Sequence, residues 1–236
     1  MKIEGRNAVI EALNSGTTID KLYVKQGAFD KVLQKIIDLA RNGNVPIKFV
    51  NNDAIDKMSD TKHHQGVIAF TTEFKYSTVE DILNEKPVPF ILILDGIEDP
   101  HNLGSIIRVA DCMGVSGIII GKNRCCSVNE TVIKVSAGAT SYVKIAKVTN
   151  INTEIERLKE KNIWVYACEL GGDDLTKANL KGAIAIGIGS EGRGVSHLTK
   201  KLCDGIVTIP QKGNVNSLNA SVATGIVLYE TMKQRD

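Results

Sequence analysis

Aromatic residues and long apolar runs are both scarce in this chain of 236 residues. Aromatic side chains make up 5% of it, which argues against base stacking as the main source of any nucleic-acid affinity. The longest apolar runs, 90–94 and 182–188, fall far short of the ~20 residues that span a bilayer. The first residues include Glu4 and Glu11 and form no apolar core of a signal peptide. We therefore expect a soluble, cytoplasmic protein with no membrane segment.

Paired cysteines and clustered metal ligands are also lacking. The cysteines are odd in number and never spaced as CxxC, so we expect buried, reduced thiols at Cys112, Cys125, Cys126, Cys168 and Cys203. His63 and His64 are adjacent, but no second pair of ligands lies nearby in the sequence. We predict no metal site.

The charge is balanced, with 29 basic and 27 acidic residues and a net charge of +2. This balance fits neither a polybasic nucleic-acid coat nor a strongly acidic binder, so RNA or DNA binding does not follow from charge alone. The length is enough for one large domain or two small ones.

The apolar pattern predicts two parts of the chain that differ in how helices and strands alternate. Residues 1–72 alternate short helices and strands, and the clearest helix is 29–42, whose apolar residues recur at helical spacing. A polar stretch with Pro87 and Pro89 follows, and it predicts an extended connector over 73–88. From 89 to 236, apolar strands alternate with helices. This order is typical of an α/β fold with a mainly parallel sheet covered by helices on both faces.

Three loops follow strands of this second part, where ligands of open α/β sheets bind. They cover residues 95–108, 187–194 and 209–219. In the first loop, Asn102 is a candidate N-cap, and Arg108 either serves a site or forms a surface ion pair with Asp111 or Glu98. In the third, small polar side chains either cap the final helix, which we expect from about 216, or bind a polar ligand: Asn214, Asn216, Ser217 and Asn219.

The second loop contains the pattern GxGxxG at Gly187, Gly189 and Gly192, which makes a dinucleotide-binding oxidoreductase an alternative. Three features weigh against it. The pattern comes late in the domain, Glu191 inside it would repel a pyrophosphate, and no acidic residue follows at the expected distance of about 20 positions. A glycine-rich loop with an embedded carboxylate suits a ligand that is cationic or carries amino groups.

Taken together, the three loops resemble the signature motifs of the SpoU-type (TrmH-like) RNA ribose 2′-O-methyltransferases. The matching segments are DPHNLGSIIR, IGSEGRGV and IPQKGNVNSLNASVA, in the family's order and spacing. The segments IEGRNAVIEAL and HHQGV are similar to the small substrate-binding domain of the bacterial rRNA members, which is related to ribosomal protein L30e. The resemblance covers nearly the whole chain.

The resemblance implies a fold that no periodicity argument reveals. It implies an L30e-like α/β domain over 1–72 that binds the RNA substrate, a linker over 73–88, and a methyltransferase domain over 89–236 with a deep trefoil knot. Knots are rare among protein folds, so the general rules of chain topology argue against this expectation. The resemblance also implies a homodimer that completes each active site.

For the site, the resemblance implies S-adenosylmethionine as cofactor, bound by Gly189, Ile209 and Leu218, with Gly192 and Gln211 nearby. It assigns catalytic and substrate-positioning roles to the residues that match the family's motifs: Asn102, Arg108, Glu191, Ser217 and Asn219. Because arginine is a poor base, we expect Arg108 to stabilise the developing alkoxide or to orient the adjacent phosphate.

The resemblance favours large-subunit rRNA as substrate, with a guanosine as the target. We expect Arg6 and the loop at His63–Gln65, in particular His64 and Gln65, to contact RNA; the alternative is that they are ordinary surface or capping residues. Three further alternatives stay open. They are the same reaction on tRNA, methylation of an rRNA adenosine as in antibiotic-resistance relatives, and a binding-only module that has kept the fold.

Overall fold

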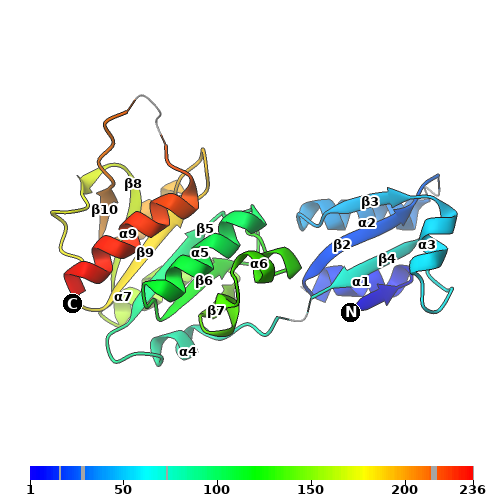
Figure 1. Cartoon of the computed structure of the whole chain (residues 1–236), viewed down its shortest axis with the longest axis horizontal. Helices are drawn as coiled ribbons and strands as arrows, with labels where there is room; N and C mark the ends of the chain where they lie inside the picture. Colours follow the sequence, from blue (N-terminus) through cyan, green and yellow to red (C-terminus); the bar gives the residue numbers. More distant parts are fainter. Residues whose placement is uncertain (16, 28–29, 73, 214–216, 236) are drawn as a thin grey trace. The chain divides into compact units, whose positions relative to one another are not determined.

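The computed structural model describes residues 1–15, 17–27, 30–72, 74–213 and 217–235, and the chain divides into two compact units (Figure 1). The first unit comprises Met1–Lys75 with Ser127–Glu130, and the second comprises Tyr76–Cys126 with Thr131–Asp236. Each unit builds its own sheet and its own core. None of the helices in the described ranges has the length and apolar character needed to cross a membrane.

The first unit is a four-stranded sheet with three helices. Its strands lie in the order β1-β4-β2-β3, and β3 is parallel to β2 while the other neighbours are antiparallel. The elements are β1 (Lys2–Glu4), α1 (Arg6–Ser15), β2 (Ile19–Lys25), α2 (Lys31–Asn42), β3 (Ile47–Val50), α3 (Asn52–Met58) and β4 (Val67–Thr71).

The predicted amphipathic helix is confirmed as α2. Its N-cap is Asp30, whose side chain accepts hydrogen bonds from the backbone N–H groups of Val32 and Leu33. The predicted first residue, Phe29, lies outside the described residues. The buried face consists of Leu33, Ile36, Ile37 and Ala40, which pack in one cluster with β2 and β4. The helical spacing of these side chains therefore builds the core of the first unit.

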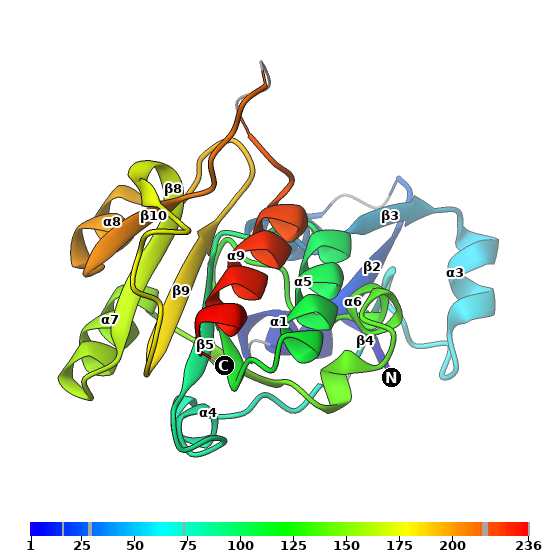
Figure 2. The same ribbon diagram turned by 60° about the vertical axis from the view of Figure 1, so that its left-hand side comes forward.

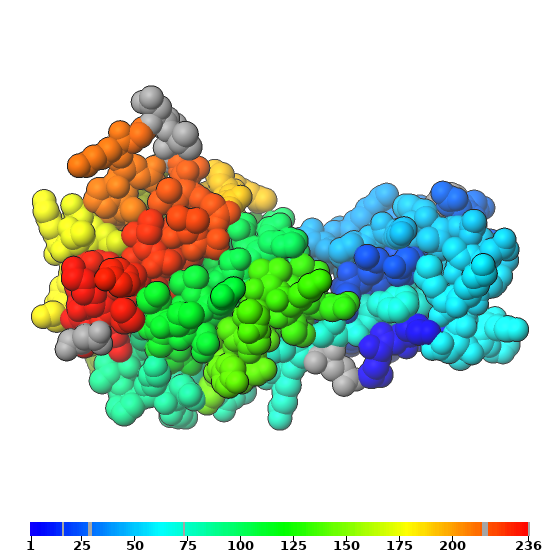
Figure 3. Space-filling view, in the orientation of Figure 1, coloured from blue at the N-terminus to red at the C-terminus, as the bar shows by residue number. Residues whose placement is uncertain are grey.

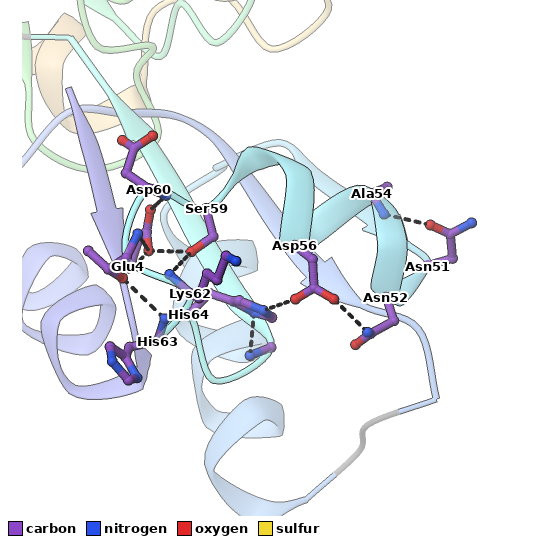
Figure 4. Close-up of polar contacts among 12 residues, drawn as sticks. Glu4, Asn51, Asn52, Ala54, Asp56, Ser59, Asp60, Lys62, His63 and His64 are labelled. Atoms are coloured by element: carbon purple, nitrogen blue, oxygen red, sulfur yellow. Dashed lines mark hydrogen bonds and ion pairs between the residues drawn. The ribbon is translucent and has the colours of Figure 1, made fainter.

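A carboxylate in β1 holds the loop between α3 and β4 (Figure 4). Glu4 accepts hydrogen bonds from the hydroxyls of Ser59 and Thr61, at 2.7 and 2.5 Å, and from the backbone N–H groups of Asp60 and Thr61, at 2.6 and 3.3 Å. Burial alone would raise the pKa of Glu4, but these four donors outweigh burial and lower the pKa to about 2. Glu4 of β1 thus fixes the loop between α3 and β4 to the sheet, although it is distant from that loop in the sequence.

The second unit is a six-stranded, wholly parallel sheet in the order β10-β8-β9-β5-β6-β7 (Figure 1). Figure 2 shows the part of this sheet that contains β10, β8, β9 and β5. The strands are β5 (Phe90–Asp95), β6 (Gly117–Gly121), β7 (Lys144–Val148), β8 (Trp164–Asp174), β9 (Ile184–Gly189) and β10 (Gly205–Thr208). The helices are α4 (Val79–Leu83), α5 (Pro100–Cys112), α6 (Glu130–Val135), α7 (Ile151–Glu160), α8 (His197–Leu202) and α9 (Ala220–Arg235), with a short 3₁₀ turn at Ala139–Ser141.

Helices cover both faces of this sheet, as the apolar strands predict. Ile91 and Ile93 of β5 pack in one buried cluster with residues of α4 and α7. On the opposite face α5 and α9 lie side by side (Figures 1 and 3). The α/β class and the parallel sheet are therefore confirmed.

Three predicted features of the second unit are wrong. The segment 73–88 is not extended throughout, because α4 forms within it; Thr78 and Asp81 make a capping box there that starts the helix. The final helix begins at Ala220 instead of near 216, since Asn219 accepts hydrogen bonds from the N–H groups of Ser221 and Val222 and so marks its start. All five cysteines were expected to be buried, but Cys112 is exposed and the other four are half-buried.

The strand order brings the first two predicted loops together. The chain runs from β5 outward through β6 and β7, and β9 later returns to the other side of β5. Asp95 at the end of β5 pairs with Gly189 at the end of β9. The loops after these strands therefore diverge from one edge, which is where open α/β sheets form a crevice.

We predict that Glu4→Gln destabilises the first unit by about 1–2 kcal/mol at neutral pH, because charge-assisted hydrogen bonds are lost. The folded pKa lies below the ordinary 4.5, so this contribution is complete above about pH 4.5 and is lost as the pH falls towards 2. Hydrogen-exchange protection of the backbone amides in β1 and β4 measures this loss of stability. Glu11→Gln, an exposed change on α1, is the control; equal protection in both variants at pH 7 would contradict the prediction.

Candidate functional site

The first predicted loop leads into α5, whose start differs from the prediction. Asp99, not Asn102, is the N-cap: its carboxylate accepts the N–H of Asn102 at 2.8 Å, and Pro100 follows as the first helical residue. Proline is favoured there because its missing N–H has no helical partner. Asn102 therefore lies in the first turn, with its side-chain amide free to bond elsewhere.

One carboxylate oxygen joins all three predicted loops. Oε1 of Glu191 accepts hydrogen bonds from Nδ2 of Asn102 at 3.2 Å, from Nδ2 of Asn219, and from the N–H of Ala220 at 3.3 Å. Nδ2 of Asn219 also donates to Oδ1 of Asn102 at 2.9 Å. These contacts link positions separated by 117 residues in the chain, so the third loop and α9 are held against the first two loops.

The loop carrying Glu191 is shaped by glycines that admit close backbone contact. A Cβ atom at Gly189 would lie 1.9 Å from the carbonyl carbon of Gly194, a distance that no side chain tolerates. Gly194 has a φ of +64°, and a Cβ there would meet the carboxylate of Glu169. That carboxylate accepts the N–H of Val195 at 2.9 Å. Glycine at 189 and 194 thus lets the loop fold back on itself beside β8.

A cavity of about 450 Å³ opens beside this loop, a volume within the usual range for small-molecule sites. All five residues expected to hold the cofactor line it: Gly189, Gly192, Ile209, Gln211 and Leu218. Of the five expected catalytic residues, Glu191 and Ser217 line the cavity, and Asn102 and Asn219 are bonded to Glu191.

Several lining residues were not predicted from the sequence. They lie within β8, on α8 or on α9: Cys168, Glu169, Leu170, Lys200, Ala220 and Ala223. The signal for the β8 group was available, because β8 is one more parallel strand whose carboxyl end faces the same edge.

The cavity combines apolar walls with charged side chains of both signs, since Arg193 and Lys200 line it together with two glutamates. Ile209, Leu218 and Ala223 provide apolar surface, and Glu169 and Glu191 provide carboxylates. Lys200 lies 3.7 Å from Glu169 and offsets part of its charge. Burial raises the pKa of Cys168 to about 12, so its thiol is neutral and a poor nucleophile. The arrangement suits a flat apolar group joined to a cationic or amino-bearing part.

Arg108 is the one expected catalytic residue that this chain does not bring to the cavity. It is exposed on α5, and it makes no hydrogen bond or ion pair within the described ranges, including the ion pairs with Asp111 or Glu98 that were considered. It follows Asn102 by six residues, and at 3.6 residues per turn the two side chains emerge on different sides of the helix.

In the first unit, the residues expected to contact RNA are also used inside the fold. Nη2 of Arg6 lies 2.7 Å from Asp30, and its Nε donates to the carbonyl of Gln65 at 3.0 Å. His64 is buried, with Nε2 2.7 Å from Asp56 and Nδ1 accepting the N–H of Gly66 at 3.0 Å. These contacts fix the end of the loop shown in Figure 4. Whether the loop touches RNA stays a prediction.

Comparison with known families identifies both parts of the chain. Residues 89–229 match the model of the SpoU rRNA Methylase family, and residues 2–77 match a model described as RNA 2′-O ribose methyltransferase substrate binding.

Across the residues that the structure describes, no three histidine, cysteine, aspartate or glutamate side chains form a cluster suited to a metal ion.

Whole-chain relatives and solved structures agree with these matches. A Bacillus subtilis protein, provisionally named a TrmH family tRNA/rRNA methyltransferase, is 39% identical and aligns over 98% of this chain and 95% of its own. One from Staphylococcus saprophyticus with the same provisional name is also 39% identical, over 99% and 96%.

Among solved structures, the AdoMet-bound rRNA methyltransferase of Sinorhizobium meliloti is 27% identical with a TM-score of 0.63, covering 98% of this chain and 86% of its own. The SpoU methyltransferase AviRb of Streptomyces viridochromogenes, in complex with AdoMet, is 22% identical with a TM-score of 0.64, over 99% and 90%. This second likeness supports the fold.

We predict that Gly189→Ala destabilises the second unit by about 2–4 kcal/mol, because the new Cβ displaces the backbone of Gly194. Trp164, the single tryptophan, lies on β8, so its fluorescence follows urea unfolding of this unit. Gly213→Ala is the control, since no atom lies within 4 Å of its Cβ position. Equal midpoints for the two variants would refute the close contact.

Proposed function

The chain belongs to the SpoU rRNA methylase family, and on this premise we propose that it transfers a methyl group from S-adenosylmethionine to a ribose 2′-hydroxyl of RNA. The observation that carries the proposal is the hydrogen-bonded group of Asn102, Glu191 and Asn219 at the edge of a cavity suited to this cofactor. The dinucleotide alternative finds less support, because α8 begins only at His197, five residues after Gly192, and the glycine loop does not open directly into a helix.

The cavity fits the cofactor on its own chemistry. Ile209, Leu218 and Ala223 would pack against the adenine ring, and the carboxylates of Glu169 and Glu191 suit a molecule with a sulfonium and an ammonium group. Gly189 and Gly192 have no side chains, so their backbone groups are accessible to it. When bound, S-adenosylmethionine supplies an electrophilic methyl group; the residues of the chain supply its orientation.

Most of the catalysis lies in holding the hydroxyl in line with that methyl group. We assign this work to Asn102, Glu191 and Asn219, whose mutual hydrogen bonds fix their positions, with Ser217 at the cavity wall. Arg108 would stabilise the alkoxide that develops as the hydroxyl loses its proton, or hold the adjacent phosphate.

We further propose a homodimer in which Arg108 acts at the partner's cavity. Arg108 is exposed and does not line the cavity of its own chain. On α9, the helix that lies beside α5, three apolar side chains are exposed: Val222, Ile226 and Tyr229, at 50, 40 and 55%. Such a set of exposed apolar side chains is typical of a surface that another protein covers. A two-fold arrangement would complete both sites at once.

We also propose that the chain path through this site is a trefoil knot. Two facts support it: the chain leaves β10 at one edge of the sheet, and α9 then lies beside α5, with Ala220 bonded to the loop after β9. An experimental structure in which residues 205–220 do not pass through that loop would contradict the knot.

For the substrate we propose a guanosine of large-subunit rRNA, contacted by the first unit through Arg6 and Gln65. His64 is buried with both ring nitrogens bonded inside the fold, so it positions this loop and does not itself reach the RNA. The match of residues 2–77 to a substrate-binding model supports an RNA contact in this unit. The curated relatives are named for tRNA and rRNA alike, so tRNA and an rRNA adenosine are the alternatives. Arg6→Ala and Gln65→Ala are expected to weaken RNA binding while S-adenosylmethionine affinity stays unchanged; unchanged RNA binding would contradict the contact.

The experiment that tests the function is transfer of labelled methyl from S-adenosylmethionine to unmodified large-subunit rRNA, with tRNA in parallel. We expect label on one rRNA nucleotide, resistant to alkaline cleavage because its 2′-oxygen is methylated. Label on tRNA alone would overturn the rRNA assignment and keep the reaction. If neither RNA is labelled, the proposed reaction on free RNA is wrong.

We predict that Arg108→Ala abolishes methyl transfer and leaves the Kd for S-adenosylmethionine nearly unchanged. If the partner's arginine completes each site, mixing Arg108→Ala with the equally inactive Asn219→Ala restores about a quarter of the activity, because half of the dimers are mixed and each holds one intact site. No recovery in mixtures that exchange subunits would show that Arg108 acts within its own chain.

A further inference from the structure

A second cavity shares a wall with the first. It measures about 260 Å³ and lies at the carboxyl ends of β5, β6 and β7. Ser190, Arg193 and Gly194 line both cavities, so the loop that carries Glu191 separates them. A group bound in the second cavity would therefore lie one loop away from the site of methyl transfer.

The lining of this second cavity is polar and includes side chains with no other role in the fold. Asn123 and Arg124, in the loop after β6, are exposed and make no hydrogen bond or ion pair in the part of the chain that the structure describes. Asn150 uses its Oδ1 to cap α7 through the N–H of Asn152. Its amide NH₂ has no partner within the same described ranges. The side chains of Asn123 and Arg124 and the amide NH₂ of Asn150 thus line this cavity and are available to bind a ligand.

The loop that carries Asn123 and Arg124 is fixed in an unfavourable backbone conformation. Arg124 has a φ of +53°, in the left-handed region that side chains other than glycine rarely adopt. The following residues bind it to the loop after β5: the N–H of Cys126 donates to the carbonyl of Ile97 at 2.7 Å, and the N–H of Gly96 donates to Sγ of Cys125 at 3.3 Å. Strain held in place by surrounding contacts is a mark of functional positions.

The charges in the second cavity disfavour a free anion. They favour a group that offers hydrogen-bonding edges as well as charge. Asp95 accepts the N–H of Ser196 at 2.9 Å, and Glu98 lies 3.5 Å from Arg193, so both carboxylates already have partners. What stays available is an amide beside a guanidinium. That pair bonds to nucleobase edges and to a phosphate, and proteins read unpaired RNA bases in this way.

From this geometry we propose that the second cavity receives the nucleotide next to the methylated one in the RNA strand, with Asn123 and Arg124 contacting its base. The inference rests on the proposed methyl transfer to RNA. Consecutive nucleotides of one strand would lie on the two sides of the loop at Ser190–Gly194, one ribose at the cofactor and the neighbouring base in the second cavity. The cavity would thus set which sequence around the target is accepted.

The test uses the whole protein and a short transcript that contains the nucleotide mapped by methyl transfer to rRNA. The variants are Asn123→Ala and Arg124→Gly; glycine adopts the φ of residue 124 without strain, so the change removes the arginine side chain without straining the backbone. Lys122→Ala is the matched control, because it removes a positive charge from the same loop at a position that does not line the cavity.

We expect Arg124→Gly to lower kcat/KM for the transcript about tenfold or more, with the Kd for S-adenosylmethionine unchanged and with Lys122→Ala much less affected. Transcripts substituted at each neighbour of the target add a second readout. Wild-type enzyme would discriminate among bases at one neighbouring position, and Asn123→Ala would lose that discrimination.

Three outcomes would overturn the inference. If both variants behave like Lys122→Ala and keep the wild-type base preference, the cavity binds no neighbouring base while the proposed function stands. If Arg124→Gly weakens cofactor binding, the loop acts by shaping the first cavity. If wild-type enzyme methylates no RNA, the proposed function fails and this inference fails with it.

Discussion

The three loops at the carboxyl edge of the second unit's sheet are joined by hydrogen bonds to one oxygen of Glu191. Three donors from two distant segments meet there, the side chains of Asn102 and Asn219 and the N–H of Ala220. Bonds to a charged acceptor are stronger than neutral ones, so a single carboxylate can hold three loops at the carboxyl edge of the sheet. Without it, the third loop and the start of α9 would lack their attachment to the other two.

This arrangement divides the edge of the sheet into two cavities. The loop between Gly189 and Gly194 separates the two cavities. Its tight path requires glycine at both positions, because a Cβ atom at Gly189 would collide with the backbone and one at Gly194 would collide with Glu169. The first cavity has apolar walls together with charges of both signs, whereas the second is lined mainly by polar side chains, among them Asn123 and Arg124. A methyl donor on the first side and an RNA strand crossing to the second is the division of labour that these linings favour.

Much of this could be predicted from the sequence, and the failures have local causes. Unbroken apolar strands separated by helices predict the parallel sheet, and the predicted loops after β9 and β10 contain most of the residues that line the larger cavity. Asn102 was misplaced as N-cap because Asp99 competes for that position and Pro100 fixes the result. The six-residue spacing from Asn102 already places Arg108 on another side of α5. The spacing does not show what Arg108 contacts there, and the homodimer stays a proposal that rests on the family resemblance.

The central claim is that Asn102 and Asn219 act through the same carboxylate. The most direct test is a double-mutant cycle on S-adenosylmethionine affinity, measured calorimetrically for wild type, Asn102→Ala, Asn219→Ala and the double variant. If the two amides depend on a shared Glu191, the double variant loses about as much affinity as the more damaging single change. Losses that simply add would show two independent side chains and would contradict the account.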